Sequence, residues 1–469
     1  MTAPRLSGLA SPRAFALELR GTPATQADVE ASIEAVLREA DRGVIAQLVV
    51  APPGAGKTEL TLDGVAQASG LHGERVLVAS NTRAQAYALA RRFVNKYGRL
   101  TVTLFVRRKR DVPADLRAHA RVRVEEHIQN LPPAPCVVVA TIDKLAQSAL
   151  VPASFDTLFV DEMYQVPAHK YLPVAALATK QRGIGDPGQI EPVTKIDVTR
   201  WRDDPAGAHV PAPRVLQVRD PGLVVTRLSV SRRLVADSVE FVQPAFYQDL
   251  PFRALDGAAE RHLEFRTLAR HEPHDDVLHR LEHGASIVLA ELPRAFGRVD
   301  DPGVAATLVS LAERLLARGA HLVTPEGARP ITPADLGIVC AHVEQVGAVQ
   351  ARLPDALRPH VLVETANRFQ GLERQVVLVW HPLAGQAAPR AFHLTAGRFC
   401  VALSRHRVAC ILVARAGLEE TLEHYREETV PRLGDDEDPE YAGLHAHRTI
   451  LTQLRALDRV VEVSESTGL

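Results

Sequence analysis

The stretch that most constrains the fold of this chain is residues 48–60, LVVAPPGAGKTEL. An apolar run leads into a Gly-rich turn, and Lys57-Thr58 and a helix-like continuation follow. The pattern is G-x-x-x-x-G-K-[ST], with Ala51 in place of the first Gly. In such a loop the backbone N–H groups and the first turn of the next helix point at an anion. The stretch therefore predicts an α/β fold with a phosphate-binding loop after a buried strand.

The residue types of the loop fit a nucleotide with a divalent cation. Lys57 can place a positive charge on the outer phosphates, and the hydroxyl of Thr58 can bind Mg²⁺. We expect the nucleotide to be surrounded by Pro53, Gly54, Ala55, Gly56, Lys57, Thr58 and Glu59.

Composition sets the broad class. A chain of 469 residues exceeds one ordinary core, so two or three domains are expected. The net charge of −1 provides no global basic field, so any nucleic-acid surface must be a local groove. The four cysteines form no C-x₂-C pair and are expected to be buried thiols. No apolar run approaches the ~20 residues of a membrane span, and residues 1–21 lack the apolar core of a secretion signal, so we expect a cytoplasmic protein with no membrane partner.

Two successive α/β patterns follow one another along the chain. In the first we expect helices at 25–40, 60–68 and 84–93, a charged helical segment ending near residue 130, and strands at 44–50, 76–79, 135–141 and 158–160. In the second we expect helices at 304–317 and 344–353 and strands at 286–290, 336–340, 361–364, 376–380 and 411–413. Apolar strands that alternate with helices indicate parallel sheets covered on both faces. The expected domains are 1–200, a connection at 201–255, a second doubly wound domain at 256–420, and a tail at 421–469.

An acidic pair, Asp161-Glu162, ends the apolar run of residues 158–160. Ligands of open parallel sheets bind at the carboxyl ends of strands, where the phosphate loop and Gly185-Asp186 are also expected. Asp161 is therefore predicted to hold Mg²⁺, and Glu162 to orient or deprotonate the attacking water. Gln189 can donate to a phosphate and accept from a water, which suits a sensor of the γ-phosphate.

Two other clusters have competing interpretations. The basic run RRKR at 107–110 is either a solvated surface, which we favour, or a contact to a phosphate backbone, and it lacks interleaved aromatic residues. The histidines at 271, 274, 279 and 283 are read as a solvated helical face in preference to a metal site.

The ordered motifs resemble those of superfamily 1 helicases. In the first half these are GAGKT, VDEM and GDPGQIEP. In the second half, LSVSRRL at 228–234, DLGIVCAHVEQ at 335–345, VETANRFQGLERQVV at 363–377 and VALSRHR at 401–407 are similar to the later motifs of that family. The F-Q-G-x-E form is typical of the branch of RNA and DNA helicases that mostly run 5′ to 3′.

The resemblance implies further site residues and a fold of two RecA-like domains with an ATP cleft between them. Arg233 and Arg405 would act as arginine fingers on the γ-phosphate of ATP. Glu373 would hydrogen-bond the ribose, and Gln26 would contact the adenine. The strand contacts implied by the resemblance are Asn81, Thr141 and Thr365.

The sequence thus predicts an ATP- and Mg²⁺-dependent helicase or translocase that moves along single-stranded DNA or RNA. Several departures from the family weaken the expectation of duplex unwinding. Arg374-Gln375 lacks the usual Asp, and His342 stands where an aromatic residue is typical. Ser231-Arg232 replaces the usual Gln-Tyr, and residues 94–134 leave no room for the inserted domain of many relatives. The alternatives are an ATP-switched nucleic-acid clamp or remodelling ATPase without unwinding, and a signalling or defence ATPase without a nucleic-acid partner.

Overall fold

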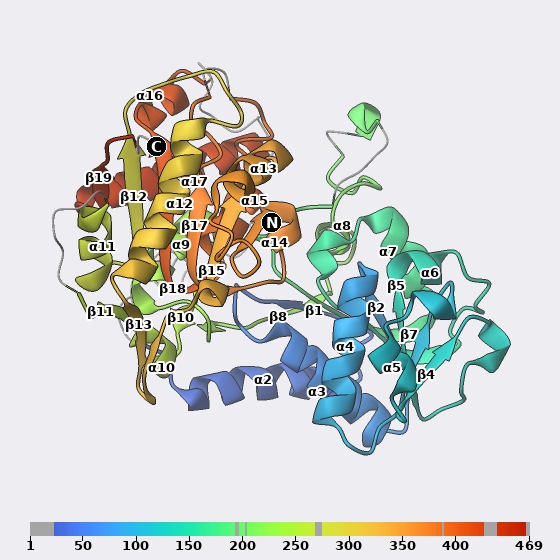
Figure 1. Cartoon of the computed structure of the whole chain (residues 1–469). Coiled ribbons are helices and arrows are strands. Elements are labelled where there is room, and N and C mark those ends of the chain that lie inside the picture. The colour runs from blue at the N-terminus through green and yellow to red at the C-terminus, as the bar shows by residue number, and fades with distance from the viewer. Residues whose placement is uncertain are drawn as a thin grey trace. The chain divides into compact units, whose positions relative to one another are not determined.

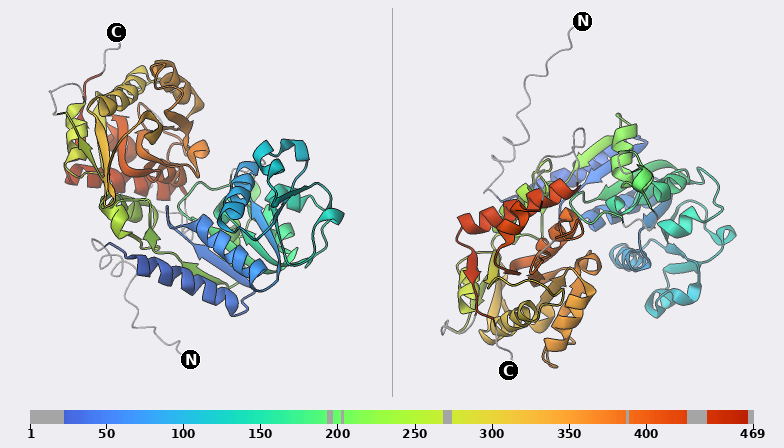
Figure 2. Two further views of the ribbon diagram at one scale, coloured as in Figure 1. Left: turned by 60° about the horizontal axis from the view of Figure 1, so that its bottom comes forward. Right: turned by 90° about the horizontal axis from the view of Figure 1, so that it is seen from above.

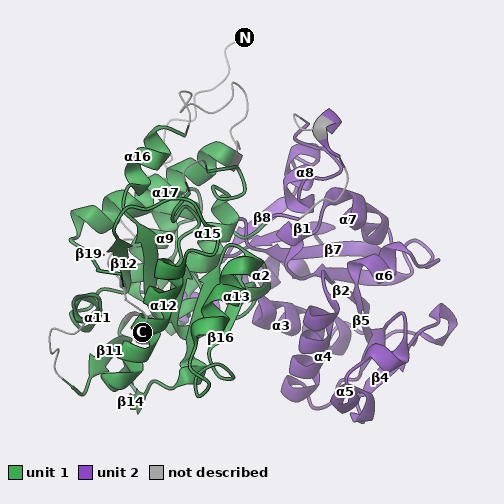
Figure 3. Cartoon of the chain, turned by 45° about the horizontal axis from the view of Figure 1, so that its top comes forward, with its two compact units in different colours: residues 1–26, 188–190, 230–469 green, residues 27–187, 191–229 purple. Residues whose placement is uncertain are grey.

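The computed structural model describes residues 23–192, 197–201, 204–267, 274–386, 389–425 and 439–465. The chain divides into two compact units, coloured separately in Figure 3. Unit 2 comprises Ala27–Pro187 and Glu191–Ser229, and unit 1 comprises the described parts of Met1–Gln26, Gly188–Ile190 and Val230–Leu469. The expected connection at 201–255 is therefore shared between the two units, and the described residues of the expected tail lie in unit 1.

Unit 2 is built on an eight-stranded sheet in which every neighbouring pair is parallel (Figure 1). Its strands, in spatial order, are β4 (Val122–Glu125), β3 (Val102–Phe105), β5 (Cys136–Thr141), β2 (Arg75–Ser80), β6 (Phe155–Val160), β7 (Ala178–Gly185), β1 (Ala46–Val50) and β8 (Val224–Arg227). The central strands are almost wholly buried, which explains their continuous apolar sequences.

Helices cover both faces of this sheet. Figure 3 shows α3 (Lys57–Gly70) and α4 (Arg83–Lys96) below β1, β7 and β2, and α7 (Ala168–Ala175) and α8 (Ala212–Arg219) above them. The short helix α6 (Ile142–Ala146) packs with α7. The helix α2 (Gln26–Asp41) carries the amphipathic pattern expected from the sequence.

The charged helical segment expected before residue 130 is wrong. This region contains two short 3₁₀ turns, at Lys109–Asp111 and Ile128–Asn130, the five-residue helix α5 (Ala114–Ala118) and the edge strand β4. The sequence of β4, VRVE, alternates apolar and charged residues with the period of a half-exposed strand. The neighbouring strand β3 was not predicted either.

Unit 1 is built on a six-stranded parallel sheet. Its strands, in spatial order, are β16 (Leu362–Thr365), β15 (Leu336–Cys340), β17 (Arg374–Trp380), β18 (His406–Arg415), β12 (Ile287–Leu292) and β19 (Val460–Glu462). Two smaller sheets accompany it, formed by β9 (Val230–Ser231) with β10 (Arg253–Ala254), and by β11 (His262–Phe265), β13 (Ala320–Thr324) and β14 (Gly327–Pro330).

The helices of unit 1 also form two layers. Figure 2 shows α12 (Pro302–Ala317) and α17 (Pro439–Ala456) on opposite sides of the strands. α13 (Val343–Arg352) packs beside α12, while α9 (Ala236–Phe246) and α15 (Ala396–Leu403) pack with α17. The remaining helices are α10 (Asp256–Ala259), α11 (Asp275–Glu282), α14 (Ala366–Phe369) and α16 (Leu418–Glu423). The prediction of two doubly wound parallel sheets is confirmed.

Several minor expectations can also be compared with the structure. All four cysteines are buried and free, as expected. Among the described residues no three His, Cys, Asp or Glu side chains are grouped to hold a metal, and His271 lies outside those residues. None of the described helices has the length and apolarity needed to cross a membrane.

Candidate functional site

The phosphate loop lies where the sequence places it, between β1 and α3 at the carboxyl edge of the unit 2 sheet. Gly54 and Gly56 have φ angles of 75° and 89°, a region that favours glycine, and Gly56 is the N-cap of α3. The N–H of Ala51 donates to the carbonyl of Gly185 at 2.9 Å. Ala51 does not have a positive φ angle, so alanine is tolerated where the motif usually has glycine.

Lys57 is turned into the loop and is nearly buried. Its Nζ lies 3.0 Å from Oδ2 of Asp186 and 3.4 Å from the carbonyl oxygens of both Ala51 and Pro52. Asp186 follows β7, and its side chain is fully buried. The sequence placed Asp186 at this edge but gave it no role, and the structure identifies it as the ionic partner of the phosphate-loop lysine.

Asp161 and Glu162 follow β6 at the same edge. The N–H of Asp161 donates to the carbonyl of Ala79 in β2 at 3.1 Å. Burial raises the pKa of Asp161, and the adjacent Glu162 charge raises it further, whereas Lys57 opposes the shift. Glu162 has φ 54° and ψ 47°, a left-handed conformation that non-glycine residues rarely adopt.

The carboxylate of Asp161 is suited to bind a divalent cation. Within the described part of the chain, Oδ1 of Asp161 is buried and has no hydrogen-bond partner. Mg²⁺ takes oxygen ligands, with one or two carboxylates and several waters, and a cation would offset the cost of the buried charge. The hydroxyl of Thr58, the second residue of α3, is a second oxygen from the same edge.

Glu59 does not face the phosphate loop with its side chain. Its carboxylate pairs with Arg92 and Lys96 of α4, with Nζ of Lys96 at 2.9 Å. Burial acts to raise the pKa of Glu59, but the two cations outweigh it and lower the pKa. Only the backbone of Glu59 remains for the expected nucleotide contact.

Gln26, the residue expected to contact the adenine, is the first residue of α2.

Gln189 is grouped with unit 1, although in sequence it comes shortly after strand β7 of unit 2. Its Oε1 accepts from Nε2 of Gln370 at 3.0 Å. A Cβ on Gly397 would lie 2.5 Å from the carbonyl oxygen of Gln189, so Gly397 permits this close approach. Gln189 therefore lies beside the F-Q-G motif, and its expected role at the γ-phosphate stays a prediction.

Unit 1 brings together Arg233 and Glu373, two residues that the family resemblance singled out. Nε of Arg233 donates to Oε2 of Glu373 at 2.7 Å, and its Nη1 donates to the carbonyl of Ser404 at 3.1 Å. Arg407 binds the other oxygen of Glu373. Burial would raise the pKa of Glu373, but the two guanidinium groups hold it below its usual value.

Further arginines surround this cluster. Arg405 is 1% exposed, and its carbonyl accepts from the N–H of Arg374 at 3.0 Å. Arg261 donates to the carbonyls of Arg233 and Arg232, and burial together with Arg407 lowers its pKa to about 10. Sequence reasoning missed Arg261 and Arg407, because their cationic role depends on which chain segments meet.

Two of the three expected nucleic-acid contacts line one hollow in unit 2. Ser80 and Thr141 are paired across β2 and β5, so Asn81 and Thr141 lie at adjacent strand ends. Both line a hollow of about 750 Å³ together with Arg83, Arg107, Arg108 and Lys144. We call it the basic hollow. Thr365 lies in unit 1, where it ends β16 and caps α14.

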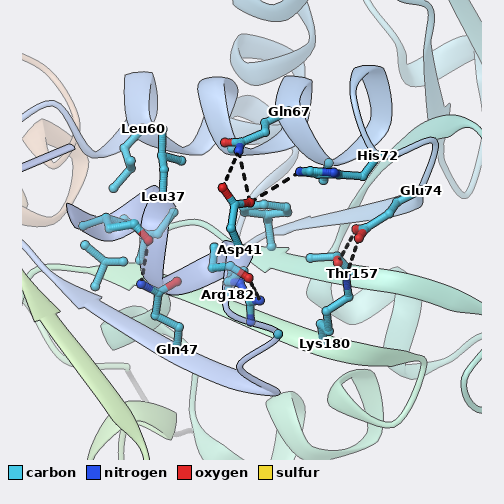
Figure 4. Close-up of a pocket in the computed structure, with 18 residues that line it drawn as sticks. Leu37, Asp41, Gln47, Leu60, Gln67, His72, Glu74, Thr157, Lys180 and Arg182 are labelled. Atoms are coloured by element: carbon cyan, nitrogen blue, oxygen red, sulfur yellow. Dashed lines mark hydrogen bonds and ion pairs between the residues drawn. The ribbon is translucent and has the colours of Figure 1, made fainter. Parts of the chain in front are cut away.

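A second pocket of unit 2 contains none of the expected site residues. It has a volume of about 240 Å³ and lies among α2, α3 and strands β1, β6 and β7 (Figure 4). Its walls are partly apolar, with Leu37 and Leu60 among them, and Arg182 donates within it to the carbonyls of Ala40 and Ile45. Because Asp41 pairs with Gln67, and Glu74 with Thr157 and Lys180, its polar groups partner one another.

The comparison with family models concerns mainly unit 1. Residues 224–417 match the model of a family described as an AAA domain. This segment, less than half of the chain, is thus similar to an AAA domain. The matching family is of the superfamily 1 helicase type, so the resemblance to that superfamily, predicted from the order of the motifs, is confirmed.

Solved structures similar to this chain include viral helicases, at low identity. The PRRSV helicase is 14% identical with a TM-score of 0.39, over 84% of this chain and 56% of that one. The Arterivirus nonstructural protein 10 helicase in complex with DNA is 16% identical with a TM-score of 0.41, over 83% of this chain and 65% of that one. This chain thus spans less than two thirds of the length of either. No curated protein matches it.

Proposed function

We propose that this chain hydrolyses ATP with Mg²⁺ and uses the energy to move along single-stranded nucleic acid. One observation carries the proposal: the phosphate loop and Asp161 lie on the same edge of one sheet as Asn81 and Thr141. The strands β2 and β6, which precede Asn81 and Asp161, are direct neighbours. A nucleotide site and a strand site built on adjacent strand ends fit a nucleic-acid-dependent ATPase.

The expected site residues of both units have separable roles in the proposed reaction. Lys57 leaves Asp186 and binds the outer phosphates, while the backbone of residues 53–59 surrounds them. Thr58 and Asp161 would hold Mg²⁺, which would neutralise phosphate charge. Glu162 accepts a proton from the attacking water. Arg233 and Arg405 supply positive charge at the γ-phosphate, Gln189 senses it, and Glu373 and Gln26 bind the ribose and adenine.

The activity is tested by the rate of ATP hydrolysis with and without single-stranded DNA and RNA. We expect strand-stimulated hydrolysis in the wild type, no hydrolysis in Lys57→Ala, and a loss of about 10²–10⁴-fold in kcat for Glu162→Gln with ATP binding retained. Glu34→Gln, a change at an exposed side chain of α2, is the control and should behave as wild type. Normal hydrolysis by Glu162→Gln would show that the general-base assignment is wrong.

A second candidate is an ATP-switched clamp or remodelling ATPase without unwinding. It is favoured by the segment between α4 and β5, which adds two strands to the sheet in place of an inserted domain. A translocase hydrolyses ATP faster on longer strands until a plateau, whereas a clamp shows no such length dependence. The choice between DNA and RNA and a cytoplasmic location stay predictions.

A further inference from the structure

The basic run at 107–110 follows β3 and enters the wall of the basic hollow. Arg107 and Arg108 line the hollow, but Lys109 and Arg110 do not. The hollow lies at the carboxyl ends of β2, β3 and β5, and Lys144 of α6 completes its basic wall. The run is therefore divided, with two of its four cations directed to the site that also contains Asn81 and Thr141.

We propose that Arg107 and Arg108, together with Lys144, bind consecutive phosphates of a single nucleic-acid strand. This inference rests on the proposed function and extends it to residues that no family motif includes. It also replaces the interpretation of the run as a merely solvated surface, which the sequence alone favoured.

The ion pairs around the hollow leave these arginines available. The two carboxylates of its lining are already paired: Asp111 lies 3.0 Å from Arg83, and Asp143 lies 2.8 Å from Lys170. No carboxylate of the described residues lies within 4.0 Å of a guanidinium nitrogen of Arg107 or Arg108, and both side chains are exposed. Two uncompensated guanidinium groups at one wall provide the bidentate donors that phosphates accept.

Lys144 is held in place beside them. Its Nζ lies 4.1 Å from the centre of the Phe105 ring and donates to the carbonyl of Glu126 at 3.3 Å. Burial lowers the pKa of Lys144, Glu126 opposes the shift, and the charge of Arg107 adds to it. Arg107 is thus close enough for the two cations to repel, and a phosphate between them would relieve this repulsion.

The hollow offers charge but no platform for bases. Its two aromatic rings, Tyr87 and Phe105, are 8% and 1% exposed. Strand binding by stacking needs exposed rings on which successive bases lie. We therefore expect the strand to be held here by its backbone, without preference for base sequence.

The test measures the binding of a fluorescently labelled single strand by anisotropy over a range of salt concentrations. Each phosphate contact on a single strand contributes about 0.7 to the slope of log K against log salt concentration. The double variant Arg107→Gln/Arg108→Gln should bind more weakly and reduce that slope by about 1.4. Arg107→Lys/Arg108→Lys should keep most of the slope, because lysine also neutralises a phosphate. The thermal unfolding of Arg107→Gln/Arg108→Gln should match wild type, since both residues are exposed.

Arg110→Gln is the matched control, because Arg110 belongs to the same run and is exposed but does not line the hollow. It should leave the slope unchanged. An equal loss in the control and the double variant, or no loss in either, would overturn the inference while the proposed function stood. A strong preference between strands of different base composition would contradict binding by the backbone alone. A wild type that binds neither DNA nor RNA strands would overturn both proposals.

Discussion

At the scale of single residues, Lys57 and Asp186 form a buried ion pair in the proposed nucleotide site of unit 2. Both side chains are withdrawn from solvent, at 9% and 0% exposure. A buried pair contributes little net stability, but removing one partner leaves a buried charge and costs about 3–5 kcal/mol. The phosphates of ATP would offer Lys57 a second set of negative charges.

We predict that Asp186→Asn lowers the free energy of unfolding by about 3–5 kcal/mol in the absence of nucleotide. ATP with Mg²⁺ should raise the melting temperature of this variant more than that of the wild type, because bound phosphates supply the lost counter-charge. Thermal unfolding with and without nucleotide measures both effects.

The control for this prediction removes both charges. Lys57→Met/Asp186→Leu leaves no buried charge, so it should be less destabilised than Asp186→Asn alone and should gain nothing from ATP. Equal stability of Asp186→Asn and the wild type would show that Lys57 does not depend on this carboxylate.

The positions of candidate site residues could be predicted from the sequence where motif spacing and strand ends determined them. The sequence predicted that Lys57, Asp161 and Glu162 lie at one edge of a sheet, because a motif and an apolar strand placed them there. It could not show that Glu59 turns to α4, or that Gln189 lies beside Gln370, because both depend on tertiary packing.

At the scale of elements, strand β7 approaches the turn after Asp161-Glu162 very closely. A Cβ on Gly185 would lie 2.8 Å from Cδ2 of Tyr164 and 3.1 Å from the backbone nitrogens of Met163 and Tyr164. A backbone neighbour cannot move away as a flexible side chain can. The glycine thus lets β7 and the acidic turn form one compact edge.

We predict that Gly185→Ala destabilises the protein by about 1–3 kcal/mol, because overpacking moves the turn that holds the acidic pair. Its kcat should fall as well, since the same shift displaces Asp161 and Glu162. Chemical denaturation and ATPase assays measure the two effects.

Gly347→Ala is the comparison for this prediction. Gly347 lies inside α13, and a Cβ there would meet nothing within 4 Å, so alanine should stabilise by up to about 1 kcal/mol through helix propensity. A Gly185→Ala variant as stable as wild type would mean that the edge adjusts without cost.

Strands with a continuous apolar sequence were predicted well, whereas strands that mix apolar and charged residues were not. Continuous apolar runs located β2, β5 and β15 to within a residue or two. The strand β4 escaped prediction because its charged residues resemble those of a solvated helix, and four residues are too few to establish a period of two. The strand β8 was hidden in a segment rich in Pro, Asp and Arg.

At the scale of the whole molecule, the residues proposed to act on the nucleotide are divided in sequence between the two units. Unit 2 supplies the phosphate loop and acidic pair, and unit 1 supplies the cluster of Arg233, Glu373, Arg405 and Arg407. The sequence predicted this division because only the first half contains a phosphate loop. It could not predict how the arginines would be arranged, since their cluster joins segments about 170 residues apart, as in the hydrogen bond from Arg233 to Ser404.

We predict that Arg405→Lys, which keeps the charge and loses the planar guanidinium, lowers kcat by about 10³-fold or more and leaves the affinity for ATP nearly unchanged. Steady-state kinetics and nucleotide binding separate these effects. Thermal unfolding close to wild type would show that the buried position tolerates lysine. An unchanged kcat would remove Arg405 from the proposed reaction.

The buried rings of the basic hollow have a consequence for motion. Phosphates repeat identically along a strand, so a wall that contacts only them meets the same energy after every one-nucleotide displacement. A base inserted between exposed rings would instead have to be extracted before each step. Because Tyr87 and Phe105 are withdrawn, we expect the barrier to a strand sliding along the proposed site to be set mainly by charge and to fall as salt rises.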